Sequence, residues 1–161
     1  MRGAAICRAL EILRWTGVIA GFQLAFTRGQ TPVEQVHILV PWLVVSLAGL
    51  TGIESVFFGK AASQSTGYAP SGYQRQSGMN NLALAATALL VYFFKWGFYA
   101  ELAVVTALLI FLFLSALNHG WSAWREGNRR LKNFMRPVMT LLLILFVTPF
   151  LWLALAFLQS R

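Results

Sequence analysis

The feature that most constrains this chain is a series of long apolar runs separated by short polar connections. Four of these runs cover residues 36–58, 78–94, 98–117 and 137–158. An apolar segment of about 20 residues can cross a bilayer as a helix, and a helix satisfies its own backbone hydrogen bonds in lipid. The chain is 58% hydrophobic and 11% charged, whereas soluble domains are about 25% charged. We therefore predict a single all-α domain over residues 1–161, built as an integral membrane bundle.

A fifth apolar run, at residues 10–26, is weaker than the other four. Arg8, Glu11 and Arg14 crowd its start. The segment therefore either spans the membrane with its charges at the interface or lies on the surface as an amphipathic helix. Within it, Gly17 and Gly21 stand four residues apart, a GxxxG spacing that permits two membrane helices to approach closely.

The distribution of positive charge decides between these two alternatives. If the first run lies on the surface, the Lys and Arg residues divide seven against six across the membrane, whereas five spans divide them ten against three. Cytoplasmic loops are enriched in Lys and Arg. We therefore predict five transmembrane helices in a bacterial inner membrane, with the N-terminus cytoplasmic and the C-terminus outside. The cytoplasmic set is Arg2, Arg8, Arg14, Lys60, Arg75, Arg125, Arg129, Arg130, Lys132 and Arg136.

Two connections carry local signals for where helices begin. Thr31, followed by Pro32 and Glu34, is typical of a helix start with a capping hydroxyl and an early proline. Residues 59–77 are rich in Ser, Gly, Gln and Tyr, so we predict a polar connection made of turns. The next helix is expected to open near residue 78, where Asn80 and Asn81 either cap it or bridge it to other helices.

The polar stretch at residues 52–82 carries the one indication of a binding site. Glu54 lies at its start, inside the end of an apolar run. A carboxylate at membrane depth is energetically costly and often marks an ion or proton pathway. Alternatively, Glu54 reaches the interface and pairs with Lys60 or Arg75.

Several further polar side chains share a membrane face with Glu54, because consecutive spans alternate in direction. A histidine there can relay a proton, ligate a metal or contact a quinone or a lipid head group, or it can simply interact with the C-terminal dipole of its helix. We predict that the ligand or ion-binding candidates are Glu54, Gln74, Asn80, Asn81, Asn118 and His119. The basic loop that follows supplies candidates for contact with anionic lipid head groups, namely Arg129, Arg130, Lys132 and Arg136.

The sequence lacks the motifs of the common enzyme classes. It contains no P-loop, GxSxG or HExxH pattern. One cysteine and two histidines are too few to predict a metal site or a cofactor. The positive charge is concentrated in loops and accompanies no nucleic-acid-binding module, so we expect no nucleic acid partner.

Residues 67–82 carry a recognisable pattern: Gly-Tyr, a Ser/Pro turn, then Tyr-Gln-Arg-Gln-Ser-Gly-Met-Asn-Asn-Leu. This resembles a family of small multi-span prokaryotic membrane proteins known only as a domain of unknown function. Tyr68 replaces the family's Trp and Gln76 its Glu, and Asn118-His119 resembles its later Gly-His. The resemblance covers residues 49–137, implies the multi-span architecture and implies no activity. The matching positions are Gln74, Gly78, Asn81 and Leu82.

Short loops, small-residue helix faces and the missing catalytic motifs favour a non-enzymatic role. We predict a structural or accessory subunit that acts through membrane partners, either other subunits or a second copy of the chain. The alternative is a small transporter or a proton- or ion-coupled protein that uses the polar cluster at the cytoplasmic face. A membrane enzyme or redox subunit is the third hypothesis.

Overall fold

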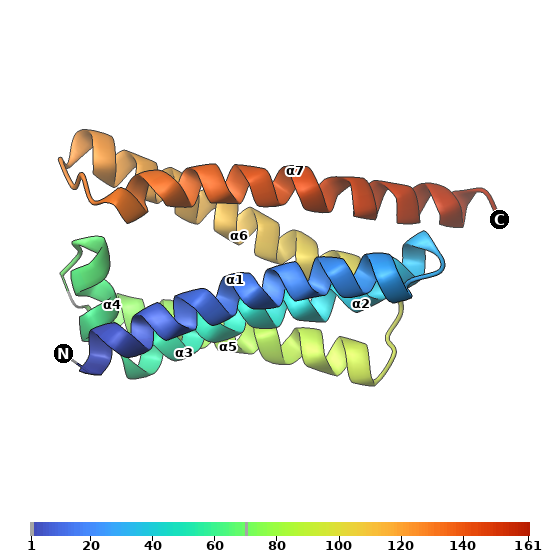
Figure 1. Ribbon diagram of the computed structural model, residues 1–161, viewed down its shortest axis with the longest axis horizontal. Coiled ribbons are helices and arrows are strands. Elements are labelled where there is room, and N and C mark those ends of the chain that lie inside the picture. Colours follow the sequence, from blue (N-terminus) through green and yellow to red (C-terminus); the bar gives the residue numbers. More distant parts are fainter. Residues whose placement is uncertain (1, 70) are drawn as a thin grey trace.

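The computed structural model describes residues 2–69 and 71–161, and every regular element in them is helical, as predicted. Figure 1 shows an elongated bundle whose long helices run along its length. In chain order the elements are α1 (Arg2–Arg28), α2 (Pro32–Val44), the π-helix η1 (Val45–Gly49), α3 (Leu50–Phe57), α4 (Gly59–Thr66), α5 (Gly72–Phe93), α6 (Phe98–Arg125) and α7 (Leu131–Gln159).

Four helical segments of the described chain are long and apolar enough to cross a membrane. They include the N-terminal segment, which the charge distribution favoured as a span over a surface helix. The protein is therefore an all-α membrane bundle. Most of segment 78–94 lies within α5, which is 22 residues long but begins with the polar sequence GYQRQSGMNN and is not among the four. The four segments are Gly3–Arg28, Pro32–Phe57, Phe98–Arg125 and Leu131–Gln159.

The segment formed by α2, η1 and α3 lies at the centre of the bundle. Its most apolar stretch is 61% buried, against 17%, 28% and 22% for the other three candidate spans. The core around it consists of aliphatic side chains, including Leu39, Leu43, Val105, Leu108 and Val147. The outer faces of the bundle also carry large apolar side chains, such as those of α7, because their neighbour is lipid rather than water.

The connections alternate between the two ends of the bundle. The start of α1, the whole of α4 and the α6–α7 connection lie at one end, which we call the polar end (Figure 1). The α1–α2 connection, the α5–α6 connection and the C-terminal end of α7 lie at the other. The stretch 52–82 and the end of α6 therefore meet at the same end, as alternation predicts.

The polar connection at residues 59–77 is more ordered than the sequence indicated. It contains α4, which ends at Gly67 in the left-handed conformation (φ 76°), where glycine avoids a Cβ clash. The next helix begins at Gly72 and is capped by Ser71, whose Oγ accepts from Gln74 N (3.3 Å). The expectation that Asn80 or Asn81 caps this helix is thus wrong, because Ser71 offers the cap nearly three turns earlier.

The GxxxG pair of α1 allows a close contact with α2 and η1. A Cβ built on Gly17 would lie 2.1 Å from Ser46 Oγ, and one on Gly21 would lie 2.6 Å from Trp42 Cβ. Neither distance is possible for real atoms, so only glycine fits at these two positions. The structure thus has the close helix approach that the GxxxG spacing permits.

A contact between His37 and the buried Glu101 side chain joins elements at the end opposite to the polar end. His37 Nδ1 of α2 contacts Glu101 Oε1 near the start of α6, and the Glu101 carboxylate is almost fully buried. The His37 ring also stacks on Tyr92 of α5, with ring centroids 4.7 Å apart. These contacts join three helices at this end.

We expect Gly17→Leu to lower the free energy of unfolding by about 1–3 kcal/mol, the usual cost of forcing extra atoms into a packed contact. Thr16→Leu is the matched control, because Thr16 is exposed on the same helix. The measurement is the unfolding transition of the two purified variants in the same detergent. Equal transitions for both variants would contradict the close contact.

Candidate functional site

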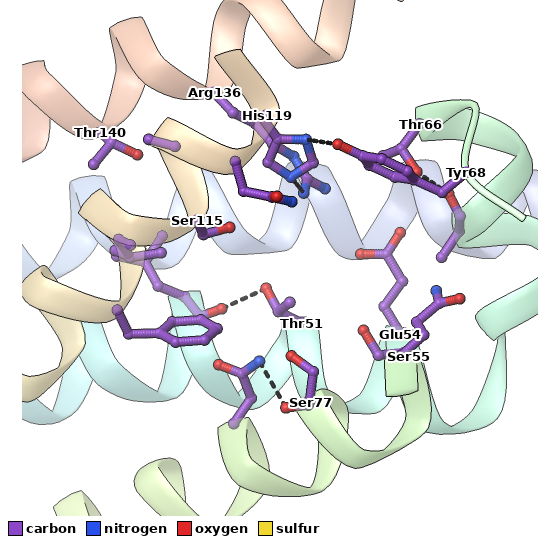
Figure 2. A pocket seen from close by; sticks show the side chains of 18 of the residues that line it. Thr51, Glu54, Ser55, Thr66, Tyr68, Ser77, Ser115, His119, Arg136 and Thr140 are labelled. Atoms are coloured by element: carbon purple, nitrogen blue, oxygen red, sulfur yellow. Dashed lines mark hydrogen bonds between the residues drawn. The ribbon is translucent and has the colours of Figure 1, made fainter. Parts of the chain in front are cut away.

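A cavity of about 430 Å³ lies inside the polar end of the bundle. Its walls come from α1, η1, α3, α4, α5, α6 and α7, and Figure 2 shows their polar side chains turned into a shared space. Five of the six sequence-predicted ligand candidates line it, namely Glu54, Gln74, Asn81, Asn118 and His119. Asn80 is exposed and does not line it.

The first charged element of the cavity is an ion pair between α1 and α3. Arg14 Nη2 donates to Glu54 Oε2 at 2.7 Å, and both side chains are largely buried, with exposed fractions of 12% and 8%. Glu54 therefore pairs with neither Lys60 nor Arg75, the partners considered from the sequence. Arg14 Nε is buried and has no hydrogen-bond partner within the described part of the chain.

The second element is a hydrogen-bond chain centred on the buried His119. Arg136 Nη1 donates to His119 Nε2 (2.5 Å), which requires that nitrogen to be unprotonated. The Nδ1 proton then points to Asn133 Oδ1 (2.8 Å), and Tyr68 Oη lies 3.3 Å from the same nitrogen. In this arrangement the imidazole is neutral.

Asn133 extends this chain to the α4 backbone. Its Nδ2 donates to the carbonyls of Thr66 (3.2 Å) and Asn128 (3.0 Å). Asn128 Nδ2 donates to the Thr66 carbonyl as well (3.0 Å). Two of these bonds satisfy the carbonyl of Thr66, the last residue of α4, and connect α4 to the α6–α7 connection and the start of α7.

The amides predicted from the sequence have mainly structural contacts. Gln74 accepts from Ser63 Oγ and donates to the Gly59 carbonyl (3.1 Å), so it joins α5 to α4. Asn81 is buried and donates to the Ser77 carbonyl one turn earlier (3.1 Å). Asn118 lines the cavity from α6 while remaining exposed.

The four basic head-group candidates separate into three environments. Arg129 and Arg130 are exposed. Lys132 pairs with Glu11 of α1 at 2.7 Å, a contact that is open to solvent or lipid. Arg136 alone lines the cavity. The structure thus brings one of the four together with the ligand candidates.

The π-helix η1 shapes the cavity wall between α2 and α3. It follows Pro41, whose missing N–H weakens the hydrogen-bond ladder of the preceding helix. Thr51 Oγ1 donates to the Leu47 carbonyl (2.5 Å), and both residues line the cavity. Single π-turns inside membrane or soluble helices occur often at functional sites.

Sequence reasoning missed Arg14, Asn133 and Tyr68 as members of this cluster. Arg14 was counted only as a charge that sets orientation, and its partner lies 40 positions along the chain. The available signal was an arginine directly before the apolar run of α1. Tyr68 was noted only as a substitution in the family pattern.

The chain matches the family described as "Family of unknown function (DUF6790)" over residues 10–161. No curated protein matches it. No solved structure matches it either.

Removing one partner of the buried Arg14–Glu54 pair is expected to be costly. Glu54→Gln should lower the free energy of unfolding by about 3–5 kcal/mol, because it leaves a buried guanidinium unpaired. The double variant Arg14→Gln/Glu54→Gln should recover a large part of that loss. The measurement is a double-mutant cycle of unfolding free energies.

The matched control is Glu11→Gln, which removes a carboxylate from an ion pair of the same 2.7 Å length but with side chains 32% and 39% exposed. It should cost about 1 kcal/mol or less. Equal losses in Glu54→Gln and Glu11→Gln would show that the Arg14–Glu54 pair is as solvated as a surface pair.

Proposed function

The chain belongs to a family of unknown function, DUF6790, and from that premise we propose that it is a multi-pass membrane protein that binds an anionic ligand in the cavity at its polar end. The ligand is a molecule with a carboxylate or phosphate group. The residues that contact this group are Arg136 and Arg14, with His119, Tyr68 and the cavity hydroxyls around them.

One observation carries the proposal: the charges that line the cavity do not balance. Two guanidinium groups, those of Arg14 and Arg136, share it with a single carboxylate, that of Glu54. Glu54 is engaged by Arg14, and no carboxylate of the described chain lies within ion-pair distance of Arg136. An uncompensated charge at membrane depth is energetically costly. A bound anion would neutralise it with charge-assisted hydrogen bonds.

This proposal is favoured over the two roles considered from the sequence. An accessory subunit needs a partner-facing surface, whereas the cavity gives the chain a polar site of its own. A proton- or cation-coupled protein needs a carboxylate available to the cation, whereas Glu54 is occupied by Arg14. Neutral His119 already accepts from Arg136, so the imidazole positions the guanidinium rather than competing with it.

We also propose that the polar end faces the cytoplasm of a bacterial cell and that α5 is the fifth span. The ten-to-three division of Lys and Arg supports the orientation. The positions of the start of α1 and the end of α7 at opposite ends of the bundle support an odd number of crossings (Figure 1). Helix α5 contacts α2, η1 and α3 and runs beside them.

We expect the purified protein to bind methyl phosphate and to be stabilised by it against thermal unfolding. Arg136→Gln should weaken binding about 10- to 100-fold, because a hydrogen bond to a charged group contributes about 1.5–3 kcal/mol. Titration of the unfolding midpoint with methyl phosphate, and in parallel with acetate, measures the effect. Arg130→Gln is the control, since Arg130 is exposed on the same basic segment.

The variant Glu54→Gln tests whether the cavity favours a negatively or a positively charged ligand. Loss of the competing carboxylate should make methyl phosphate bind more tightly, because the Arg14 guanidinium is then no longer shared with Glu54. Weaker methyl phosphate binding in Glu54→Gln, or equal binding in Arg136→Gln and the wild type, would contradict an anion site. Either result would favour the cation-coupled alternative.

The orientation predicts that alkaline phosphatase fused after Arg161 is active, because that enzyme works only on the outer side of the bacterial inner membrane. A fusion after Arg125, in the α6–α7 connection, should be inactive. Colony and whole-cell phosphatase activity measures both. An active fusion after Arg125 together with an inactive fusion after Arg161 would contradict the proposed orientation.

A further inference from the structure

Three cavity walls change character in the same order from the polar end inward. Each wall presents an ionisable side chain first, a hydroxyl about one turn deeper and a leucine two turns deeper. Helices α3 and α6 run toward the polar end, so residues with lower numbers lie farther from that end (Figure 1). Helix α7 runs away from the polar end, so residues with higher numbers lie farther from it. The lining residues that follow this order are Glu54, Thr51 and Leu47 on α3 and η1, then His119, Ser115 and Leu112 on α6, and Arg136, Thr140 and Leu143 on α7.

The spacing is what places these residues on one face of each helix. Steps of three or four residues return to the same side of a helix, and seven residues complete about two turns. At 1.5 Å per residue, seven residues correspond to about 10 Å along the helix axis. The cavity therefore has a charged level, a hydroxyl level and an apolar level over about 10 Å.

The middle level offers hydrogen bonds that are not already used. Figure 2 shows Ser115 and Thr140 lying to one side of His119, with Tyr68 and Thr66 on the other. No hydrogen bond of the described chain engages the Ser115 or Thr140 hydroxyl, and neither oxygen is among the buried unpartnered atoms. Both hydroxyls are therefore accessible from within the cavity.

The deep level is apolar and reaches the outer surface of the bundle. Leu47 and Leu143 are each 5% exposed, so they form closed walls. Phe111 also lines the cavity and is 37% exposed. It lies eight residues inward from His119, so a residue that lines the cavity at its apolar level is also exposed on the outer surface of α6.

We propose that the ligand is a single-chain amphiphile: an anionic phosphate or carboxylate head group, a polar neck and one alkyl chain. This inference rests on the anion site proposed above. The head group binds at Arg136 and Arg14, the neck accepts from Ser115 and Thr140, and the chain lies along Leu47, Leu112 and Leu143. The volume of about 430 Å³ is in the lower part of the range for small-ligand sites, about 300–1,000 Å³, which fits one chain rather than two.

A water-soluble anion would leave the leucine level unused. Its polar atoms would have no hydrogen-bond partners beyond the hydroxyl level, and burying them there is unfavourable. An alkyl chain that moves from lipid to the leucine level, in contrast, only exchanges one apolar environment for another, and no polar atom loses a hydrogen-bond partner. The charged level then decides binding, and the apolar level decides where the chain lies.

The test uses the full chain in nanodiscs of zwitterionic lipid and decyl phosphate that carries a diazirine at its terminal carbon. After illumination, peptide mass spectrometry maps the labelled residues. We expect label around Leu112 and Leu143, a loss of at least tenfold in Arg136→Gln, and retention in Arg136→Lys and in the exposed control Arg130→Gln. The same chain with a carboxylate in place of the phosphate distinguishes the two head-group sources.

Filling the deep level gives a second readout. Leu143→Phe, or Leu112→Phe from the facing helix, should move the label toward the hydroxyl level, whereas Leu145→Phe on the exposed face of α7 should not. Label confined to Leu145 and Phe146, with equal yield in all variants, would overturn the inference. If methyl phosphate still binds in an Arg136-dependent way but the deep level is never labelled, the amphiphile is excluded and the anion site stands.

Discussion

The close antiparallel contact between α1 and α2 is the constraint on which the site depends. Gly17 lies against Ser46 and Gly21 against Trp42, and no side chain can be inserted between them. This contact fixes how far α1 is displaced along α2 and α3. Arg14, one turn before Gly17, is thereby brought to the level of Glu54. The electrostatic character of the cavity thus follows from two glycines that do not line it.

Much of the fold could be predicted because the signals are local. The apolar runs indicate helices, since lipid leaves the backbone few alternatives. Thr31 accepts from Glu34 N at 3.2 Å and caps α2, as the Thr-Pro-x-Glu pattern indicates. The Gly17–Gly21 spacing predicted a close helix contact, and alternation predicted that Glu54 and His119 lie at one end. Each of these follows from neighbouring residues or from the geometry of the membrane.

The pairing inside the site could not be predicted, because it depends on tertiary contacts. Glu54 has nearer cationic residues in sequence, Lys60 and Arg75, yet it pairs with Arg14 from another helix. From the sequence, Arg136 is expected to contact lipid head groups together with Arg129 and Arg130, whereas in the structure Arg136 lines the cavity. The helix α4 could not be predicted because its Ser- and Gly-rich composition is typical of turns, whereas the carbonyl of its last residue, Thr66, accepts from the distant Asn128 and Asn133.

A buried carboxylate is engaged by another helix near each end of the bundle: Glu54 by Arg14 at one end and Glu101 by His37 at the other. Between them the described core is aliphatic, with Leu39, Leu43 and Val147 almost fully buried. The cavity is therefore blind toward the far side of the membrane. An amphiphile of the kind proposed would therefore arrive and depart through the half of the bilayer at the polar end, and its occupancy would report the composition of that leaflet alone.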